Sequence, residues 1–241
     1  MENRRLPARI TLFAGHYGSG KTNIAINYAR WIRRSASGGG MPPDVTVADL
    51  DIVNPYFRTK DSAAELAAEG IGLVVSEYAN SNVDFPALPK ELYALAGNDG
   101  YAVMDIGGDD RGALALGRYR DDIVSGGDYE MLGVVNASRP LTRTPEDAVE
   151  VLREIESAGG IPFTGIVNNT NLGQETVASD VTESVRFAEE AARIMGLPLR
   201  FTCCEKSLAE KLEGQFARFP SDGSLFPLEI QRLYYHSIES S

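Results

Sequence analysis

Cysteine and histidine are both scarce in this sequence. Its 241 residues include two cysteines, Cys203 and Cys204, and two histidines, His16 and His236. Neighbouring cysteines seldom form a relaxed disulfide, and no C-x-x-C spacing is present for a metal site. We therefore expect two thiols in a buried strand of a reduced protein rather than a disulfide scaffold or an iron–sulfur carrier. A Ser-His-Asp or Cys-His hydrolase would have to use one of these two histidines, and nothing else favours that chemistry.

Long hydrophobic runs and excess positive charge are also missing. No run approaches the roughly 18 apolar residues that a membrane span needs, and the apolar residues 10–14 behind the basic start are too few for a signal peptide. Acidic residues outnumber basic ones by 34 to 23, and the net charge of −11 disfavours a broad nucleic-acid or membrane surface. Arg30, Arg33 and Arg34 are expected to form a solvated helix end. The sequence predicts a cytoplasmic protein without a nucleic-acid or membrane partner.

Short apolar, β-branched runs alternate with longer helical patterns along the chain. Strands are predicted at residues 9–14, 45–49, 71–76, 101–106, 130–136, 163–168 and 199–203, and helices at residues 21–34, 62–69, 90–96, 113–124, 145–158, 180–195 and 207–213. Such alternation implies right-handed crossovers and a mostly parallel sheet. We therefore predict an α/β fold with a doubly wound sheet of about seven strands. Thr144, before Pro145, and Ser179 are predicted as helix N-caps.

No linker, repeat or low-complexity tract divides the chain. We expect one domain over residues 1–241, with a core at about residues 8–215 and a C-terminal tail at 216–241. The tail is aromatic and nearly balanced in charge, so docking on the protein's own core or on a partner is expected rather than membrane binding.

A glycine-rich turn directly follows the first predicted strand. Residues 15–22, GHYGSGKT, match the pattern G-x-x-x-x-G-K-[ST], and a helical pattern follows them. In such a P-loop the glycines let backbone N–H groups and the helix N-terminus point at phosphates. Lys21 would reach the β- and γ-phosphates, and the Thr22 hydroxyl would bind Mg²⁺. The nucleotide-binding residues predicted in this segment are Gly15, His16, Tyr17, Gly18, Ser19, Gly20, Lys21, Thr22 and Asn23.

Two other strand ends carry the carboxylates that a P-loop needs. The strand at residues 101–106 closes on D-x-x-G, so Asp105 suits the Mg²⁺ shell and the N–H of Gly107 or Gly108 suits the γ-phosphate. The strand at residues 45–49 closes on Asp49-Leu50-Asp51, at the same ligand edge of a parallel sheet. We expect Asp49 to support Mg²⁺ or the P-loop, and Asp51 to orient the attacking water. The alternative is a capped turn whose Asp and Asn side chains make only local hydrogen bonds.

The residue that reads the base has a weaker signal. No N-K-x-D or T-K-x-D occurs, so the guanine-reading carboxylate of common GTPases is missing. The strand at residues 163–168 instead ends in Asn168, whose amide offers both a donor and an acceptor for adenine. The alternative is an ordinary Asn-rich turn.

Together, the P-loop, the D-L-D, the D-x-x-G and the strand-end Asn resemble the MinD/ParA-type P-loop ATPases, a group often described with the CobQ/CobB proteins. The similarity covers roughly residues 8–215, and GHYGSGKTNIAINYA, ADLDIVNPYFR, MDIGGDDRGALALGRY and VNNTNLG resemble a bacterial ATP-binding branch of that group. The resemblance implies Mg-ATP at the strand ends, slow hydrolysis that drives a switch, a protein partner and an ATP-sandwiched homodimer.

One position departs from that group. The P-loop usually carries a second, signature lysine just after its first glycine, and this sequence has His16 there, followed by Tyr17 in place of glycine. A neutral imidazole does not supply the charge of a lysine at physiological pH. Arg58 and Arg111 are candidate substitutes.

The leading hypothesis is an ATP-dependent switch with weak ATPase activity. Lys21, Asp51 and Asp105 are its predicted catalytic residues, and Thr22, Asp49 and Asp105 its predicted metal ligands. The first alternative is a synthetase or kinase of the dethiobiotin-synthetase and CobQ kind, with an acceptor pocket beside residues 56–58 or 80–89. The second is a nucleotide-binding module that does not hydrolyse ATP.

Overall fold

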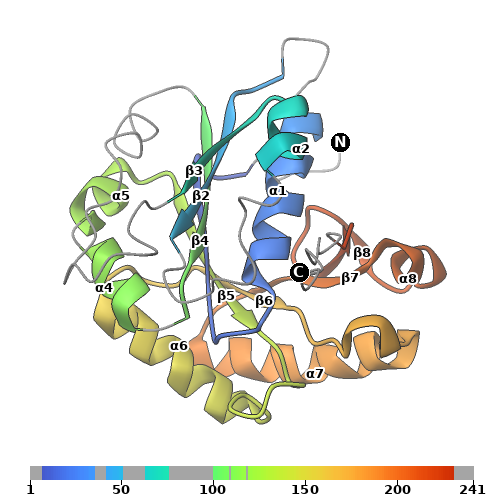
Figure 1. The fold of residues 1–241 in the computed structure, drawn as a ribbon. Helices are drawn as coiled ribbons and strands as arrows, with labels where there is room; N and C mark the ends of the chain where they lie inside the picture. The colour runs from blue at the N-terminus through green and yellow to red at the C-terminus, as the bar shows by residue number, and fades with distance from the viewer. Residues whose placement is uncertain are drawn as a thin grey trace, which may run out of the picture.

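Among the residues that the structure describes, a sheet of nine strands forms the centre of the protein (Figure 1). The computed structural model describes residues 7–35, 42–50, 63–75, 100–108, 110–117 and 119–230. The strand order is β3-β2-β4-β1-β5-β6-β7-β9-β8. The strands are β1 (Ile10–Ala14), β2 (Val45–Leu50), β3 (Ile71–Val75), β4 (Tyr101–Ile106), β5 (Tyr129–Val135), β6 (Gly165–Asn168), β7 (Leu199–Glu205), β8 (Ala217–Arg218) and β9 (Ser224–Leu228). Every neighbouring pair is parallel, which confirms the predicted parallel α/β sheet.

Helices cover both faces of this sheet. One face carries α1 (Lys21–Ser35) and α2 (Ala63–Ala68), and the other carries α4 (Asp110–Gly117), α5 (Arg120–Gly126), α6 (Pro145–Gly159) and α7 (Ala178–Met195) (Figure 1). A 3-10 turn, η3 (Gly173–Glu175), and α8 (Lys206–Lys211) follow β6 and β7. The adjacent strands β1 and β5 therefore send their helices, α1 and α6, to opposite faces. Open α/β sheets bind ligands in the crevice at such a point, outside the carboxyl ends of the strands.

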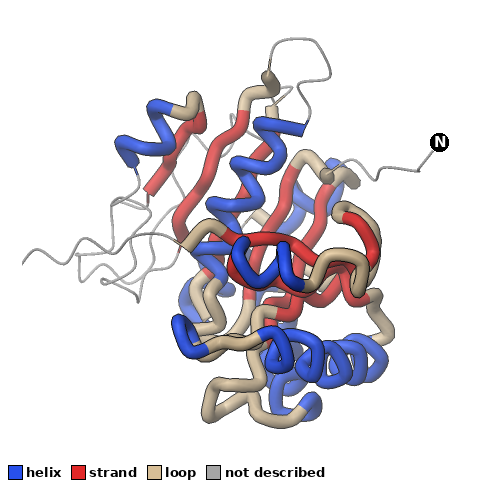
Figure 2. Tube along the Cα trace, turned by 90° about the vertical axis from the view of Figure 1, so that its right-hand side faces the viewer, coloured by secondary structure: helices blue, strands red, loops and turns tan. Residues whose placement is uncertain are grey.

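Each face of the sheet has its own apolar core. Along β1, Leu12 and Ala14 contact the core under α4, α6 and α7, whereas Phe13 points into the core under α1. This alternation follows from the two-residue period of a strand, and a strand covered on both faces is apolar throughout. Figure 2 views the α1 side and shows this helix in front of the strands, running in much the same direction. An aromatic cluster joins the α1 core to the C-terminal strands; it comprises Phe13, Tyr28, Trp31, Phe201, Phe219 and Phe226.

The sheet continues past the core limit of residue 215 that we expected. β9 pairs with β7, and the side chain of Asn27 on α1 bonds both backbone groups of Glu229, accepting from its N–H at 2.9 Å and donating to its carbonyl at 3.0 Å. The Asn27 amide thus makes the two backbone hydrogen bonds that a neighbouring strand would make with the residue after β9. The described part of the tail therefore docks on the protein's own core, and β8 and β9 are strands that the sequence did not predict.

Local signals predicted the long elements better than their ends. Thr144 caps α6 as predicted, because its hydroxyl accepts from the N–H of Asp147 at 3.2 Å. Ser179 is not an N-cap; α7 begins at Ala178 because the Asp180 carboxylate accepts from the N–H of Val177 at 2.9 Å. The helix expected at 113–124 is two helices, α4 and α5. The helix expected at 90–96 lies outside the described residues.

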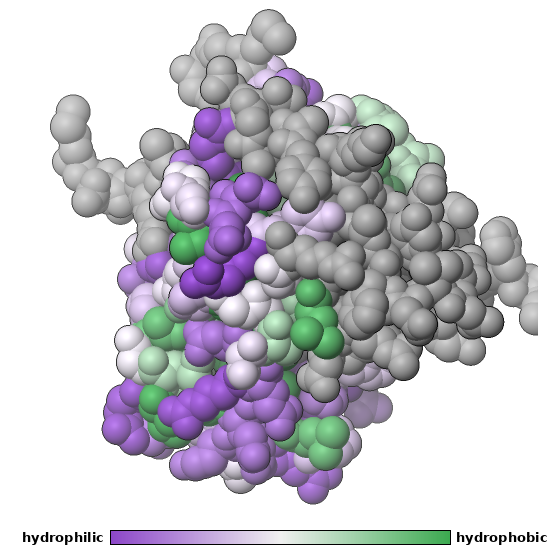
Figure 3. Space-filling view, turned by 90° about the vertical axis from the view of Figure 1, so that its left-hand side faces the viewer, coloured by the Kyte–Doolittle hydropathy of each residue, from purple (hydrophilic) through white to green (hydrophobic). Residues whose placement is uncertain are grey.

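One arginine of α1 is more buried than expected, whereas Arg34 is exposed. Arg30 is not solvated: it is buried and forms an ion pair with Glu69 of the α2 region at 2.8 Å, and a second with Glu65. Arg30 thus joins α1 to α2 instead of presenting a basic surface. Viewed from the α4 and α5 side, the described surface is mainly hydrophilic, with apolar residues in separate spots (Figure 3). None of the helices in the described segments is long and apolar enough to cross a membrane.

Candidate functional site

The loop between β1 and α1 wraps into a compact turn at the carboxyl edge of the sheet. The Ser19 N–H donates to the His16 carbonyl at 3.1 Å, and the Lys21 ammonium donates to the same carbonyl at 3.3 Å. Lys21 is only 4% exposed and is the first residue of α1. A buried cation therefore lies at a helix N-terminus whose N–H groups carry partial positive charge, an arrangement suited to an anion.

Two glycines permit close approach around this loop. Gly20 has φ +92°, and a Cβ there would collide with the amide of Asn169. Gly108, after β4, would place a Cβ 2.5 Å from the carbonyl oxygen of Gly15 and 2.7 Å from the backbone nitrogen of Tyr17. The loop after β4 therefore lies directly against the P-loop backbone, and only a residue without a side chain fits there.

Oxygen ligands meet beside Lys21. The Thr22 hydroxyl donates a hydrogen bond to a carboxylate oxygen of Asp105. Asp49 on β2 is the register partner of Asp105 on β4, and both carboxylates are buried. Among the described residues no group of three or more His, Cys, Asp or Glu side chains could hold a metal alone. A hydroxyl with one or two carboxylates fits Mg²⁺, which is usually completed by water and substrate phosphates.

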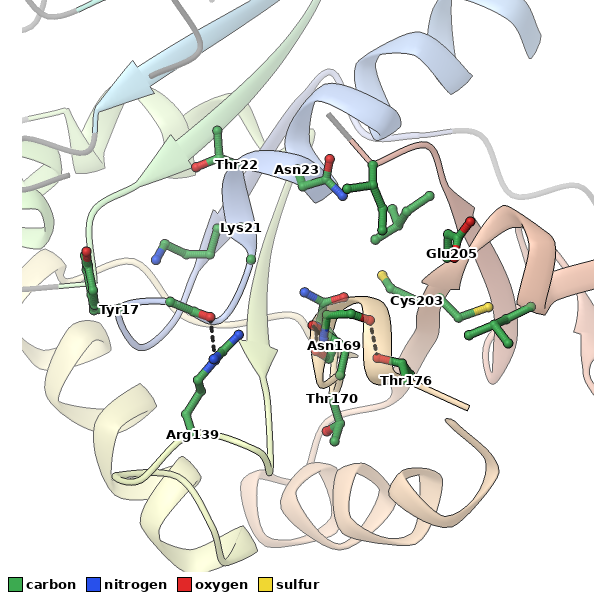
Figure 4. Close-up of a pocket in the computed structure, with 18 residues that line it drawn as sticks. Tyr17, Lys21, Thr22, Asn23, Arg139, Asn169, Thr170, Thr176, Cys203 and Glu205 are labelled. Atoms are coloured by element: carbon green, nitrogen blue, oxygen red, sulfur yellow. Dashed lines mark hydrogen bonds between the residues drawn. The ribbon is translucent and has the colours of Figure 1, made fainter. Parts of the chain in front are cut away.

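A cavity of about 390 Å³ opens beside the P-loop (Figure 4). The residues that line its P-loop end are Tyr17, Gly18, Gly20, Lys21, Thr22, Asn23 and Arg139. The residues that line its far end are Asn169, Thr170, Asn171, Gly173, Thr176, Cys203, Cys204, Glu205, Leu208, Leu228 and Ile230. Among the described lining residues, the P-loop end carries two cationic side chains, whereas the far end is largely apolar or neutral, with one carboxylate. A nucleotide is complementary to this arrangement, because it has an anionic phosphate chain at one end and a flat, uncharged base at the other.

Asn168, the predicted base-reading residue, does not reach this cavity. Its side chain is 0% exposed and donates to the Ser184 hydroxyl at 2.8 Å, while its oxygen accepts from the N–H of Thr170 at 3.1 Å. Asn168 therefore fixes the turn after β6, which is the ordinary role that the alternative interpretation gave it. The next residue, Asn169, lines the cavity and donates to the Ser19 carbonyl of the P-loop at 2.6 Å.

The remaining predicted residues have different placements. The Nδ1–H of His16 donates to the Tyr17 carbonyl at 2.6 Å, and His16 is not among the residues that line the cavity. Asp51 and Arg58 lie outside the described residues, as do the proposed acceptor-pocket segments 56–58 and 80–89. Arg111 is in α4, but its side chain is outside the described part of the structure.

Sequence reasoning missed Arg139 and most of the far end. Arg139 follows β5 and donates through Nε to the Gly18 carbonyl at 2.8 Å. The rule that was applied to the strands ending near Asp49 and Asp105 would have found it, since all carboxyl ends of a parallel sheet share one edge. Leu228 and Ile230 had no comparable signal, because β9, which ends at Leu228, was not predicted.

The two thiols of the far end are chemically quiet. Burial raises the pKa of the Cys203 thiol well above its ordinary value. Burial, with a smaller contribution from the Glu205 carboxylate, raises the pKa of the Cys204 thiol to about 11. Both cysteines are therefore neutral at physiological pH, and they act as wall residues rather than as nucleophiles or metal ligands.

Comparison with known proteins supports the fold and little beyond it. No protein-family model and no curated protein matches this chain. The cell division protein FtsY from Thermotoga maritima superimposes with a TM-score of 0.51, at 18% identity over 84% of this chain and 63% of that one. The signal recognition particle receptor FtsY from Elizabethkingia anophelis, in complex with GDP, gives a TM-score of 0.40, at 15% identity over 70% of this chain and 51% of that one.

A nucleotide-binding protein from Archaeoglobus fulgidus, in complex with ADP, gives a TM-score of 0.42, at 16% identity over 84% of each chain. This chain thus spans about half to two thirds of the length of the two FtsY chains. At 18% identity, the likeness to the T. maritima structure shows the fold alone, an α/β fold with a parallel sheet.

Proposed function

We propose that this protein binds magnesium-complexed ATP in the cavity, hydrolyses it slowly and acts as a nucleotide-dependent switch on a protein partner. The observation that carries the proposal is the contact between the Thr22 hydroxyl and the Asp105 carboxylate beside buried Lys21. These three side chains come from the start of α1 and the end of β4, which are far apart in the sequence. They are the groups that a P-loop enzyme uses to hold a triphosphate and its cation.

Each residue has a distinct task in this proposal. Lys21 leaves the His16 carbonyl and binds the β- and γ-phosphates, where it offsets negative charge that grows during hydrolysis. The N–H groups of residues 18–22 hold the phosphate chain. Thr22, Asp105 and Asp49 hold Mg²⁺, which when bound neutralises phosphate charge. Asp51 remains our proposed group for orienting the water.

We assign to Asn169 the role of recognising adenine, which the sequence analysis gave to Asn168. An asparagine amide has two N–H groups and one oxygen. After its bond to Ser19, the Asn169 side chain retains one N–H and the oxygen for a ligand in the cavity. This donor and acceptor match the amino group and a ring nitrogen of adenine.

The switch follows from the position of Gly108. Because the loop after β4 lies against the P-loop backbone and leads into α4, a change in the γ-phosphate can be passed to that helix. Loss of γ-phosphate contacts releases such loops in nucleotide switches. A partner that recognises α4 would then distinguish the two nucleotide states.

Phosphate release from Mg-ATP and Mg-GTP, measured separately with equilibrium binding of both nucleotides, tests the proposal. We expect slow ATP turnover that is lost in Lys21→Ala and retained in Lys211→Ala, a change at an exposed lysine of α8 outside the cavity. Tight ATP binding without turnover would favour the acceptor-dependent synthetase or the non-hydrolysing module. Preferential GTP turnover would contradict the adenine assignment, and no binding of either nucleotide would contradict the function altogether.

A further inference from the structure

The loop between β5 and α6 holds an arginine against the P-loop. This loop is internally bonded: the Thr142 hydroxyl donates to the Asn136 carbonyl at 2.7 Å, and the Ser138 N–H donates to the Asn136 side-chain oxygen at 3.0 Å. The Ala137 N–H also donates to the Thr170 hydroxyl at 3.0 Å. Arg139 therefore projects from a fixed backbone, and its Nε–H donates to the Gly18 carbonyl at 2.8 Å.

That hydrogen bond uses only one of the N–H donors of the Arg139 side chain. A guanidinium carries five N–H donors in a planar fork, and the bond to Gly18 uses the one on Nε. Across the part of the chain that the structure describes, no carboxylate forms an ion pair with Arg139. The side chain is half-buried and lines the cavity. Its terminal nitrogens, Nη1 and Nη2, are thus available to a ligand.

The ligand that fits these donors is an anion at the P-loop end. Figure 4 shows Arg139 on the same side of the cavity as Tyr17 and Lys21, with Glu205 at the opposite side. Of the described residues that line the cavity, Lys21 and Arg139 are the two cations. A planar fork of donors matches two oxygens of a phosphate, whereas an uncharged sugar or base would leave the positive charge unbalanced.

We propose that Arg139 binds the phosphate chain of the nucleotide from within the same subunit. The inference rests on the proposed function, because it requires a nucleotide in this cavity. Arg139 then supplies a second positive charge next to Lys21, at a site where the His16 ring is bonded to its own loop. The Nε bond to Gly18 positions the guanidinium, and the terminal nitrogens contact the phosphates.

The alternative is that Arg139 only braces the P-loop, and one substitution separates the two roles. The side-chain amide nitrogen of glutamine lies the same number of bonds from Cα as Nε of arginine. Arg139→Gln can therefore keep the donor to Gly18 while it removes the positive charge and the terminal donors. Arg139→Ala removes both, and Arg139→Lys keeps the charge. Arg143→Gln is the matched control, because Arg143 is an exposed arginine nearby in the chain that does not line the cavity.

The experiment measures the affinity of the four variants and the parent protein for ATP, ADP and AMP at low and high salt, with melting temperatures taken without nucleotide. We expect Arg139→Gln to weaken ATP and ADP binding about 10- to 100-fold, as loss of charged hydrogen bonds does. The weakening should shrink at high salt, since screening reduces the charge term. Arg139→Lys should recover part of the affinity, and Arg143→Gln should match the parent protein.

Two results would overturn the inference in distinguishable ways. If Arg139→Gln binds ATP and ADP as the parent does while Arg139→Ala does not, the residue is a brace and the proposed function stands. If the parent protein binds none of the three nucleotides, the proposed function fails and the inference fails with it. Equal melting temperatures for the parent and Arg139→Gln exclude misfolding as the cause of a lost affinity.

Discussion

The two ends of the cavity are built in different ways. At the P-loop end, residues 17–23 turn their backbone toward the ligand, glycines and a helix N-terminus supply the geometry, and Arg139 adds a side chain from the loop after β5. At the far end, the walls come from the loop after β6, from β7 and α8, and from the end of β9. The P-loop end is charged, and its shape is determined by the backbone. The far end is nearly neutral, and its shape is determined by side chains. A change in backbone geometry at the first end should therefore affect every nucleotide, whereas a change at the second should alter affinity and selectivity by degrees.

The largest effect is expected where backbone meets backbone. Gly108→Ala would place a methyl group 2.5 Å from the Gly15 carbonyl oxygen, and neither backbone can yield as a flexible side chain would. Overpacking of this kind costs about 1–3 kcal/mol. We expect a lower melting temperature and at least about 100-fold weaker ATP binding, because the P-loop must shift. Differential scanning calorimetry and equilibrium binding measure the two effects.

Gly126→Ala provides the control for that substitution. Gly126 lies in α5, and a Cβ there would meet nothing within 4 Å. Alanine is a better helix former than glycine by about 1 kcal/mol, so stability should be equal or higher and ATP binding unchanged. Parent-like affinity in Gly108→Ala would show that the approach of the β4 loop to the P-loop has no part in binding.

A smaller effect is expected from the hydroxyl that faces the cation. Thr22→Val keeps the shape of the side chain but removes the donor to Asp105 and the proposed Mg²⁺ ligand. We expect ATP affinity to fall about 10-fold in the presence of Mg²⁺ and to lose most of its dependence on Mg²⁺. Thr22→Ser should retain that dependence. A titration with and without EDTA gives the comparison, and an unchanged Mg²⁺ dependence in Thr22→Val would remove Thr22 from the metal site.

Substitutions at the neighbouring residues Asn168 and Asn169 should have different effects, because Asn168 lies in the core and Asn169 lines the cavity. Asn168→Ala removes a fully buried amide and leaves the Ser184 hydroxyl without that donor, which should cost about 1–3 kcal/mol of stability. Its ratio of ATP to GTP affinity should be unchanged. Asn169→Ala removes the bond to the Ser19 carbonyl and the proposed adenine contact. ATP affinity should therefore fall about 10-fold, and the ratio of ATP to GTP affinity should decrease. A changed ratio in Asn168→Ala would return the base-reading role to that residue.

The same contrast explains what the sequence could predict. The P-loop residues are consecutive, and four of its eight positions have a required type, so local sequence was enough to predict the loop, its lysine and its threonine. Asp105 could be predicted because it follows an apolar strand, and strand order then brings it to Thr22. Which of two adjacent asparagines faces the cavity depends on a turn held by Thr170 and Ser184. That choice is made by tertiary contacts, and no local pattern encodes it.

The C-terminal wall shows the limit most clearly. β9 contains Pro227 within the sequence SLFPL, and proline is uncommon inside a strand. The segment is nevertheless held by pairing with β7, by the aromatic cluster and by the two bonds from Asn27. Apart from Phe219, each of these partners lies more than 20 residues away in the sequence. Long-range contacts thus override a weak local preference, as they commonly do in strands.

The smallest effect is expected at the thiols of the far end, where nucleotide binding should slow the alkylation of Cys204 by a few-fold. Cys204 lines the cavity, and burial with the nearby Glu205 raises its pKa to about 11. A raised pKa keeps the thiol protonated, so the reactive thiolate is scarce at pH 8 and increases about tenfold per pH unit well beyond pH 9. Alkylation by iodoacetamide between pH 7.5 and 10, followed by mass spectrometry in a Cys203→Ala background, should show this continuous rise. Glutathione is the control, since its rate should level off near its own, lower pKa. ATP should slow the labelling of Cys204 by occupying the cavity. A labelling rate that levels off by about pH 9 would mean that the far end is open to water. A labelling rate that ATP does not change would mean that the far end is not the site of the base.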